Sequence, residues 1–313
     1  MQLPERWRWL RPLAAILFVA FAVAVVVSQW DEVSQALATT RVVWTNVALS
    51  TVTVLVAYVI LIETWRRTVS AWGERIGWRD AARIWFVSNL GRYVPGKVWQ
   101  IGAMGVLAQE SGVSPIAATG SAVVVNIVSI IAGFAVVVAT GGRVLARYAG
   151  ETIALAAVLI LALVALPLGI TMATRLYRRM TKRELNLGSL PARAMIVALV
   201  GTSIAWLLYG IAFRWFALGV GVGGGTLASY TAAYTLSYLL GYLVLLAPGG
   251  IGVREGALVA SMTQLGLATA GEATIVAVTS RLWLTALEVV PGVLLLAFSA
   301  TGRRPAASTH RDD

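Results

Sequence analysis

Two Pro-Gly breaks inside long apolar runs constrain the fold of this chain more than any other feature of its sequence. The first lies in residues 89–100, which read Asn-Leu-Gly-Arg-Tyr-Val-Pro-Gly-Lys-Val-Trp-Gln. The second lies in residues 247–256, which read Ala-Pro-Gly-Gly-Ile-Gly-Val-Arg-Glu-Gly. Backbone that leaves the helix at membrane depth is tolerated only where protein packs around it or where it lines a wet cavity. Two such breaks in corresponding halves of a transporter-like chain point to a substrate site between them.

The composition places the chain among the all-α polytopic membrane proteins. Hydrophobic residues make up 58% of the 313 residues and charged residues only 12%, whereas about a quarter of the residues of a soluble domain are charged. We therefore expect a single integral membrane domain over residues 1–313. The net charge of +11 is spread over short loops, which favours lipid headgroups rather than nucleic acid as its partner. The chain has no cysteine, and its single histidine, His310, lies in a polar tail, so we expect no cofactor and no metal site.

Six apolar runs are long enough to cross the membrane, namely 12–30, 42–62, 116–139, 152–172, 194–220 and 273–300. We expect the first to be a retained helix rather than a signal peptide, because no small-residue cleavage site follows it. The two runs that contain the breaks, 84–109 and 226–267, allow two interpretations. Each run either spans the membrane as a kinked helix or forms a re-entrant hairpin that enters and leaves on one side.

The distribution of basic residues favours six spans and two re-entrant hairpins. In that topology two tails and two loops lie in the cytoplasm. The N-terminal and C-terminal tails each hold 3 basic residues, the loop 63–83 holds 5, and the loop 173–193 holds 6. The outer loops hold only Arg41, Arg143 and Arg147. Each half of the chain then contains two spans, a hairpin and one span. We therefore predict an inverted repeat with halves 12–139 and 152–300 and short cytoplasmic tails, 1–11 and 301–313.

The chemistry of the breaks favours an anion site. After each break a new helix begins with unpaired backbone N–H groups and the positive end of its dipole, and a cation lies nearby. In the alternative interpretation, the glycines and prolines serve helix packing and the cations reach the headgroups. The candidate substrate-binding residues are Arg92, Tyr93, Pro95, Gly96, Lys97, Pro248, Gly249, Gly250, Gly252, Arg254, Glu255, Arg281 and Glu288.

Ionisable residues within apolar runs are functional candidates by default. Arg281 and Glu288 lie seven residues apart on one face of the last span, where they form either a structural pair through water or a functional one. Glu255, beside Arg254, is either a permanent ion partner or a proton carrier. Arg214 lies near the outer end of its span, and we expect it to reach the interface.

Other polar residues in the apolar runs have a packing interpretation. Four tyrosines recur every four residues and form either a packing stripe or a path for a lipid-linked sugar: Tyr230, Tyr234, Tyr238 and Tyr242. Three further residues are expected to form helix–helix hydrogen bonds: Ser121, Asn126 and Ser129.

Residues 91–99 and 248–256 resemble the two signatures of the lysylphosphatidylglycerol synthase transmembrane-domain family, also called the flippase-domain family. The resemblance extends over nearly the whole chain in length and motif order. It implies movement of a lipid between leaflets, whereas a separate soluble domain of the full-length synthases aminoacylates that lipid. Stand-alone members are often linked with lipid-linked sugars. Here the chain ends thirteen residues after Ala300, so we do not carry over the transferase activity and expect no enzyme.

We therefore expect a flippase for a phosphate-bearing lipid, either a polyprenyl-phosphate-linked sugar or a phospholipid. Two alternatives remain: an integral membrane enzyme acting on lipid, with Glu63, Glu255 and Glu288 as its candidate acids, and a transporter of a small soluble anion. The expected partners are anionic membrane lipids, with a homodimer or a partner glycosyltransferase left open. We expect a bacterial or archaeal cell membrane, with both termini in the cytoplasm.

Overall fold

A computed structural model describes residues 42–93, 98–142, 192–244 and 250–301, together with short helical pieces between 150 and 172. All regular structure in this part of the chain is helical. The predicted span 12–30 lies outside the described residues, and the predicted span 152–172 is described only in pieces.

Four long helices form the frame of the molecule: α3 (Trp44–Ser70), α6 (Pro115–Thr140), α9 (Ala192–Gly219) and α12 (Ala270–Thr301). All four are long and apolar enough to cross a membrane. The shortest has 26 residues and is about 39 Å long, which exceeds the roughly 30 Å thickness of the hydrocarbon core. They correspond to four of the predicted spans and confirm the all-α polytopic membrane fold.

Each Pro-Gly break separates two shorter helices that pack against each other. The first pair is α4 (Trp78–Asn89), which tightens into the 3₁₀ turn η2 (Leu90–Tyr93), and α5 (Val98–Glu110). The second pair is α10 (Leu227–Leu243) and α11 (Val253–Gln264). We call these pairs hairpin 1 and hairpin 2. Helices of 12 and 13 residues, such as α4 and α5, are only about 18–20 Å long and too short to cross the hydrocarbon core.

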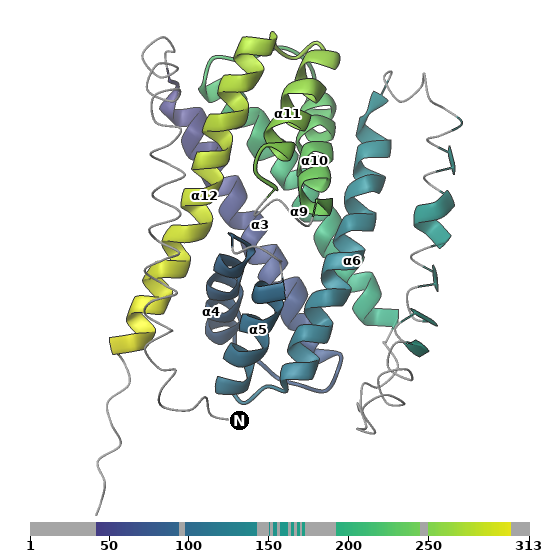
Figure 1. Cartoon of the computed structure of the whole chain (residues 1–313), viewed down its shortest axis with the longest axis vertical. Coiled ribbons are helices and arrows are strands. Elements are labelled where there is room, and N and C mark those ends of the chain that lie inside the picture. The colour runs from purple at the N-terminus through teal and green to yellow at the C-terminus, as the bar shows by residue number, and fades with distance from the viewer. Residues whose placement is uncertain are drawn as a thin grey trace, which may run out of the picture.

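The two hairpins occupy opposite halves of the molecule (Figure 1). Hairpin 1 lies in the lower half and hairpin 2 in the upper half, and the helix ends that flank each break lie near the middle. α3 and α12 run downward in this view, whereas α6 and α9 run upward. That each hairpin enters the membrane and leaves it on the same side stays a prediction.

The helix contacts are reciprocal between the two halves. α4 of hairpin 1 packs on α12 of the second half, and α10 of hairpin 2 packs on α6 of the first half. Likewise α5 packs on α6, as α11 packs on α12, while α3 and α9 share the most extensive contact. This is the pattern expected of two inverted halves. The repeat over 12–139 and 152–300 stays a prediction, because parts of both halves lie outside the described residues.

Small residues bring α9 close to its neighbours. A methyl group on Gly201 would overlap the side chain of Thr64 on α3, and one on Gly210 would overlap Thr231 on α10. The hydroxyl of Ser50 donates to the carbonyl oxygen of Ala212 across the same α3–α9 contact. Lipid chains are as apolar as leucine, so membrane helices associate through this kind of close packing and hydrogen bonding.

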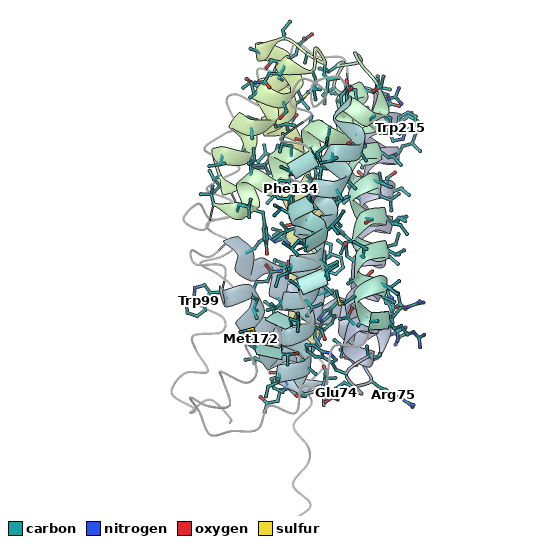
Figure 2. The ribbon with its side chains drawn as sticks, turned by 90° about the vertical axis from the view of Figure 1, so that its right-hand side faces the viewer. Glu74, Arg75, Trp99, Phe134, Met172 and Trp215 are labelled. Carbon is teal, nitrogen blue, oxygen red and sulfur yellow. The ribbon has the colours of Figure 1, made fainter. Side chains whose placement is uncertain are left out.

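The two ends of the molecule carry different side chains. Glu74 and Arg75 lie at one end, in the loop between α3 and α4, and Trp215 lies near the other end (Figure 2). At the first end Glu63 pairs with Arg66 and Arg67, each at 2.7 Å. A charged loop at one end and a tryptophan near the other agree with helices that end at membrane interfaces.

Candidate functional site

The tip of hairpin 1 positions Arg92 inside the molecule. Gly91 is required there, since a Cβ at this position would lie 2.7 Å from the backbone nitrogen of Gln100 at the start of α5. Arg92 donates to Oε1 of Glu288 at 2.8 Å and to the hydroxyl of Tyr238 at 3.1 Å. It also donates to Oδ1 of Asn89 at 3.3 Å. One guanidinium therefore contacts hairpin 1, hairpin 2 and α12.

The tip of hairpin 2 depends on glycine backbone geometry. Gly250 and Gly252 have φ of +74° and +83°, a region that residues with a Cβ rarely adopt. A Cβ at Gly250 would also lie 2.7 Å from the carbonyl oxygen of Gly241 on α10. The backbone N–H of Gly252 donates to Oε2 of Glu255 at 2.6 Å, so this carboxylate caps the start of α11.

Glu255 also forms an ion pair with α12. Its Oε1 lies 2.5 Å from a guanidinium nitrogen of Arg281, and the two side chains are only 16% and 7% exposed. Of the two roles predicted for Glu255, this geometry matches the permanent ion partner, although the partner is Arg281 rather than the neighbouring Arg254.

Arg254 is held by aromatic side chains instead of a carboxylate. Its guanidinium donates to the hydroxyl of Tyr234 at 3.2 Å and lies 4.6 Å from the ring centroid of Tyr238. The negative face of a tyrosine ring attracts a cation without neutralising it. No carboxylate in the described part of the chain lies within ion-pair distance of Arg254.

α12 joins the two hairpins. A pair through water or other groups was one of the two roles left open for Arg281 and Glu288. Instead Arg281 pairs with Glu255 of hairpin 2, and Glu288 pairs with Arg92 of hairpin 1. Both α12 residues are buried, at 6% and 8% exposure. Burying charges is costly unless they are paired, and each pair here requires its hairpin to dock on α12.

A cavity of about 110 Å³ lies beside the Arg92–Glu288 pair. It has room for several water molecules but not for a whole lipid. Aromatic rings that line it include Trp65, Trp85, Trp206 and Tyr209. The polar residues that line it are Asn89, Arg92, Gln100, Asn126, Ser129, Thr202, Tyr238, Tyr242 and Glu288. They come from both halves of the chain.

The structure brings together only part of the predicted site. Arg92 and Glu288 line the cavity, whereas Arg254, Glu255 and Arg281 form the adjoining contacts of hairpin 2. Gly250 and Gly252 shape the tip of that hairpin, and Tyr93 is described only as part of η2. The remaining predicted residues lie outside the described residues: Pro95, Gly96, Lys97, Pro248 and Gly249.

Sequence reasoning missed two amide residues of the site, Asn89 and Gln100. Asn89 and Gln100 bracket the first break and hydrogen bond to each other. Asn126, predicted as a helix–helix contact, has that role, since its Oδ1 accepts from the hydroxyl of Tyr242 on α10. Its Nδ2 donates to the carbonyl oxygen of Ala122 within α6. The sequence did contain a signal for these amides, because they lie within apolar runs and burying an unpaired amide costs free energy.

The tyrosine stripe of α10 divides between two roles. Tyr230 and Tyr234 are almost fully buried, at 1% and 2% exposure, as the packing interpretation requires. Tyr238 and Tyr242 line the cavity, as the alternative interpretation requires.

The comparison with protein families gives one match. The family model described as "Lysylphosphatidylglycerol synthase TM region" matches residues 12–292, which include both hairpins, three of the long helices and most of α12. None of the curated proteins matches the chain.

Proposed function

The chain belongs to the lysylphosphatidylglycerol synthase TM region family, and from that premise we propose that it moves a phosphate-bearing lipid between membrane leaflets. The substrate is a polyprenyl-phosphate-linked sugar or a phospholipid. The headgroup passes through the cavity between the two hairpins, while the acyl or polyprenyl chains stay in the bilayer.

The observation that carries this proposal is the pair of buried ion contacts on α12. Arg92–Glu288 and Arg281–Glu255 join α12 to hairpins from opposite halves of the molecule, and the polar cavity lies beside the first pair. Paired broken helices that meet near the midplane are the arrangement by which many secondary transporters build their substrate sites.

The charge of this cluster supports an anionic headgroup. Among the described residues of the cluster, Arg92, Arg254 and Arg281 face only two carboxylates, those of Glu255 and Glu288. In this proposal the excess positive charge lies inside the membrane, where an uncompensated cation costs free energy. A phosphate group would compensate it.

The carboxylates support transport rather than catalysis on the lipid. Acid–base catalysis requires a carboxyl group within hydrogen-bonding reach of the proton that it transfers. Glu255 and Glu288 are instead each bonded to an arginine, and Glu255 also caps α11. We therefore propose that the protein is not an enzyme.

Transport requires the cavity to widen, because about 110 Å³ cannot hold a lipid headgroup with its attached glycerol or sugar. A phosphate that binds Arg92 competes with Glu288 for the same guanidinium. Loss of the Arg92–Glu288 pair removes a contact between hairpin 1 and α12, so ligand binding and hairpin movement are coupled in this proposal.

Reconstituted vesicles test the proposal. Purified protein is placed in liposomes that contain a fluorescent phospholipid, and a membrane-impermeant reductant reports how much label reaches the outer leaflet. A parallel set of vesicles is loaded with radioactive phosphate. Lipid movement above the rate of empty vesicles, without phosphate release, is the expected result. Phosphate release without lipid movement would assign the protein to the soluble-anion transporters instead.

A further inference from the structure

Asn89 is held in one orientation at the tip of hairpin 1. It is the last residue of α4, is 2% exposed and lines the cavity. Its Oδ1 accepts from both Arg92 and Gln100. A flipped amide would place N–H against N–H at both contacts, so these two donors fix the oxygen and direct Nδ2 elsewhere.

The Nδ2 group of Asn89 is a buried donor that finds no hydrogen-bond partner within the part of the chain that the structure describes. Leaving such a group unsatisfied costs about 1–3 kcal/mol, and native proteins contain few of them. Asn126 on the same cavity has both ends of its amide bonded to protein atoms. The difference leaves Asn89 Nδ2 able to donate to a group that enters the cavity.

The neighbours of Asn89 are also donors. The hydroxyl oxygen of Tyr238 accepts from Arg92, so its own hydrogen is left to donate. Arg92 carries only N–H groups, and the acceptor nearest to it, Glu288, is engaged with it at 2.8 Å. Asn89 Nδ2 and the Tyr238 hydroxyl therefore place two donors beside the positive charge of Arg92.

We propose that Asn89 Nδ2, the Tyr238 hydroxyl and Arg92 form a subsite for one anionic oxygen of a phosphoryl group. The subsite rests on the proposed function and names the atoms that recognise its substrate. It also sets specificity, because a cationic headgroup without phosphate brings no acceptor and would leave Asn89 Nδ2 unsatisfied. Glu288 repels the phosphoryl group, and the extra positive charge of Arg254 offsets that repulsion.

The subsite is tested by lipid binding to the full-length protein in nanodiscs, measured by native mass spectrometry. The probes are phosphatidic acid, inorganic phosphate, and a diacyl lipid whose head is a trimethylammonium group without phosphate. We expect the wild-type protein to bind phosphatidic acid at least tenfold more tightly than the trimethylammonium lipid. Inorganic phosphate that binds as tightly as phosphatidic acid would support the subsite and assign it to the free ion.

Two variants in the subsite and one control variant elsewhere separate loss of the subsite from the effect of an added charge. Asn89→Asp keeps the acceptor oxygen, removes the donor and adds a negative charge, so it should weaken phosphatidic acid binding about tenfold or more. Tyr238→Phe removes the hydroxyl but keeps the aromatic ring against Arg254, and it should weaken phosphatidic acid binding severalfold. Asn46→Asp adds the same charge in the first turn of α3, away from the cavity, and should bind as the wild type does.

The results distinguish this subsite from the function on which it rests. Wild-type affinity in both Asn89→Asp and Tyr238→Phe, or equal affinity of the wild type for the trimethylammonium lipid, would overturn the subsite even if vesicles show lipid transport. Conversely, the expected binding pattern without any lipid movement in vesicles would support the subsite and overturn the proposed function.

Discussion

At the residue scale, Arg254 differs from the other two arginines of the site. Arg92 and Arg281 each have a carboxylate partner, whereas Arg254 lies against the rings and hydroxyl of two tyrosines. A cation on an aromatic face keeps its full charge. In the proposed function, Arg254 is therefore the residue whose charge should matter most for attracting the headgroup.

Replacement of Arg254 by glutamine should lower the rate of lipid transport at least tenfold, because the site loses its excess positive charge. Lysine should retain part of the rate. The matched control is Arg214→Gln, which removes the same charge near the end of α9 and should leave transport within about twofold of the wild type. Fluorescent-lipid transport in vesicles measures all three, and equal rates for the two glutamine variants would show that the charge at 254 has no special role.

At the element scale, the contact of α3 with α9 determines whether the two halves assemble. Gly201 faces Thr64 with no room for a methyl group, and Thr64 is fixed by its own hydrogen bond to the carbonyl oxygen of Ile60. A β-branched side chain in a helix has little rotamer freedom with which to move aside. Close packing at this position therefore stabilises the frame that carries both hairpins.

Gly201→Ala should destabilise the protein by about 1–3 kcal/mol, the usual cost of overpacking. The control is Gly102→Ala in α5, where a Cβ meets no atom within 4 Å and alanine should raise stability by up to about 1 kcal/mol. Thermal unfolding in detergent, followed by circular dichroism, compares the two variants. A melting temperature of Gly201→Ala at or above that of the wild type would contradict the packing account.

Element by element, hydropathy identified the four long helices that the structure describes, because a span needs only a long apolar run. The Pro-Gly breaks likewise located both hairpins, since proline cannot continue a helix and glycine allows the turn. The partners of Arg281 and Glu288 were not predictable in this way. Their spacing of seven residues describes one helix face, whereas their actual partners lie on hairpins far away in the sequence.

The amides of the cavity illustrate the same limit. Asn126 was recognised as a helix–helix contact because an amide in an apolar helix needs a partner. Asn89 and Asn126 look alike in sequence, and only the three-dimensional structure shows that one amide is satisfied and the other retains a buried donor.

At the scale of the whole molecule, the orientation of the two hairpins is the prediction on which the inverted repeat depends. The chain has no cysteine, so single introduced cysteines can be labelled on intact cells with a membrane-impermeant thiol reagent. Ser70 precedes hairpin 1 and Gln109 lies near its end, whereas Gly223 and Ala270 flank hairpin 2. Cysteines at 223 and 270 should label from outside, whereas those at 70 and 109 should react only after the membrane is permeabilised. Labelling at 223 with protection at 270 would mean that residues between them cross the membrane.

The central claim is that hairpin 1 moves relative to α12 when a lipid crosses. Leu90 at the start of η2 lies against α12, where a Cβ on Gly292 would lie 3.1 Å from its Cγ. The double variant Leu90→Cys, Gly292→Cys therefore brings two thiols close enough for a disulfide, which would hold the hairpin against the helix.

The most direct measurement is the rate of fluorescent-lipid transport by this double variant in vesicles, before oxidation, after oxidation and after subsequent reduction. Each single-cysteine variant serves as a control for oxidation itself. Our account predicts that oxidation slows transport at least tenfold in the double variant alone and that reduction restores the rate. Transport at the wild-type rate with the disulfide fully formed would contradict it.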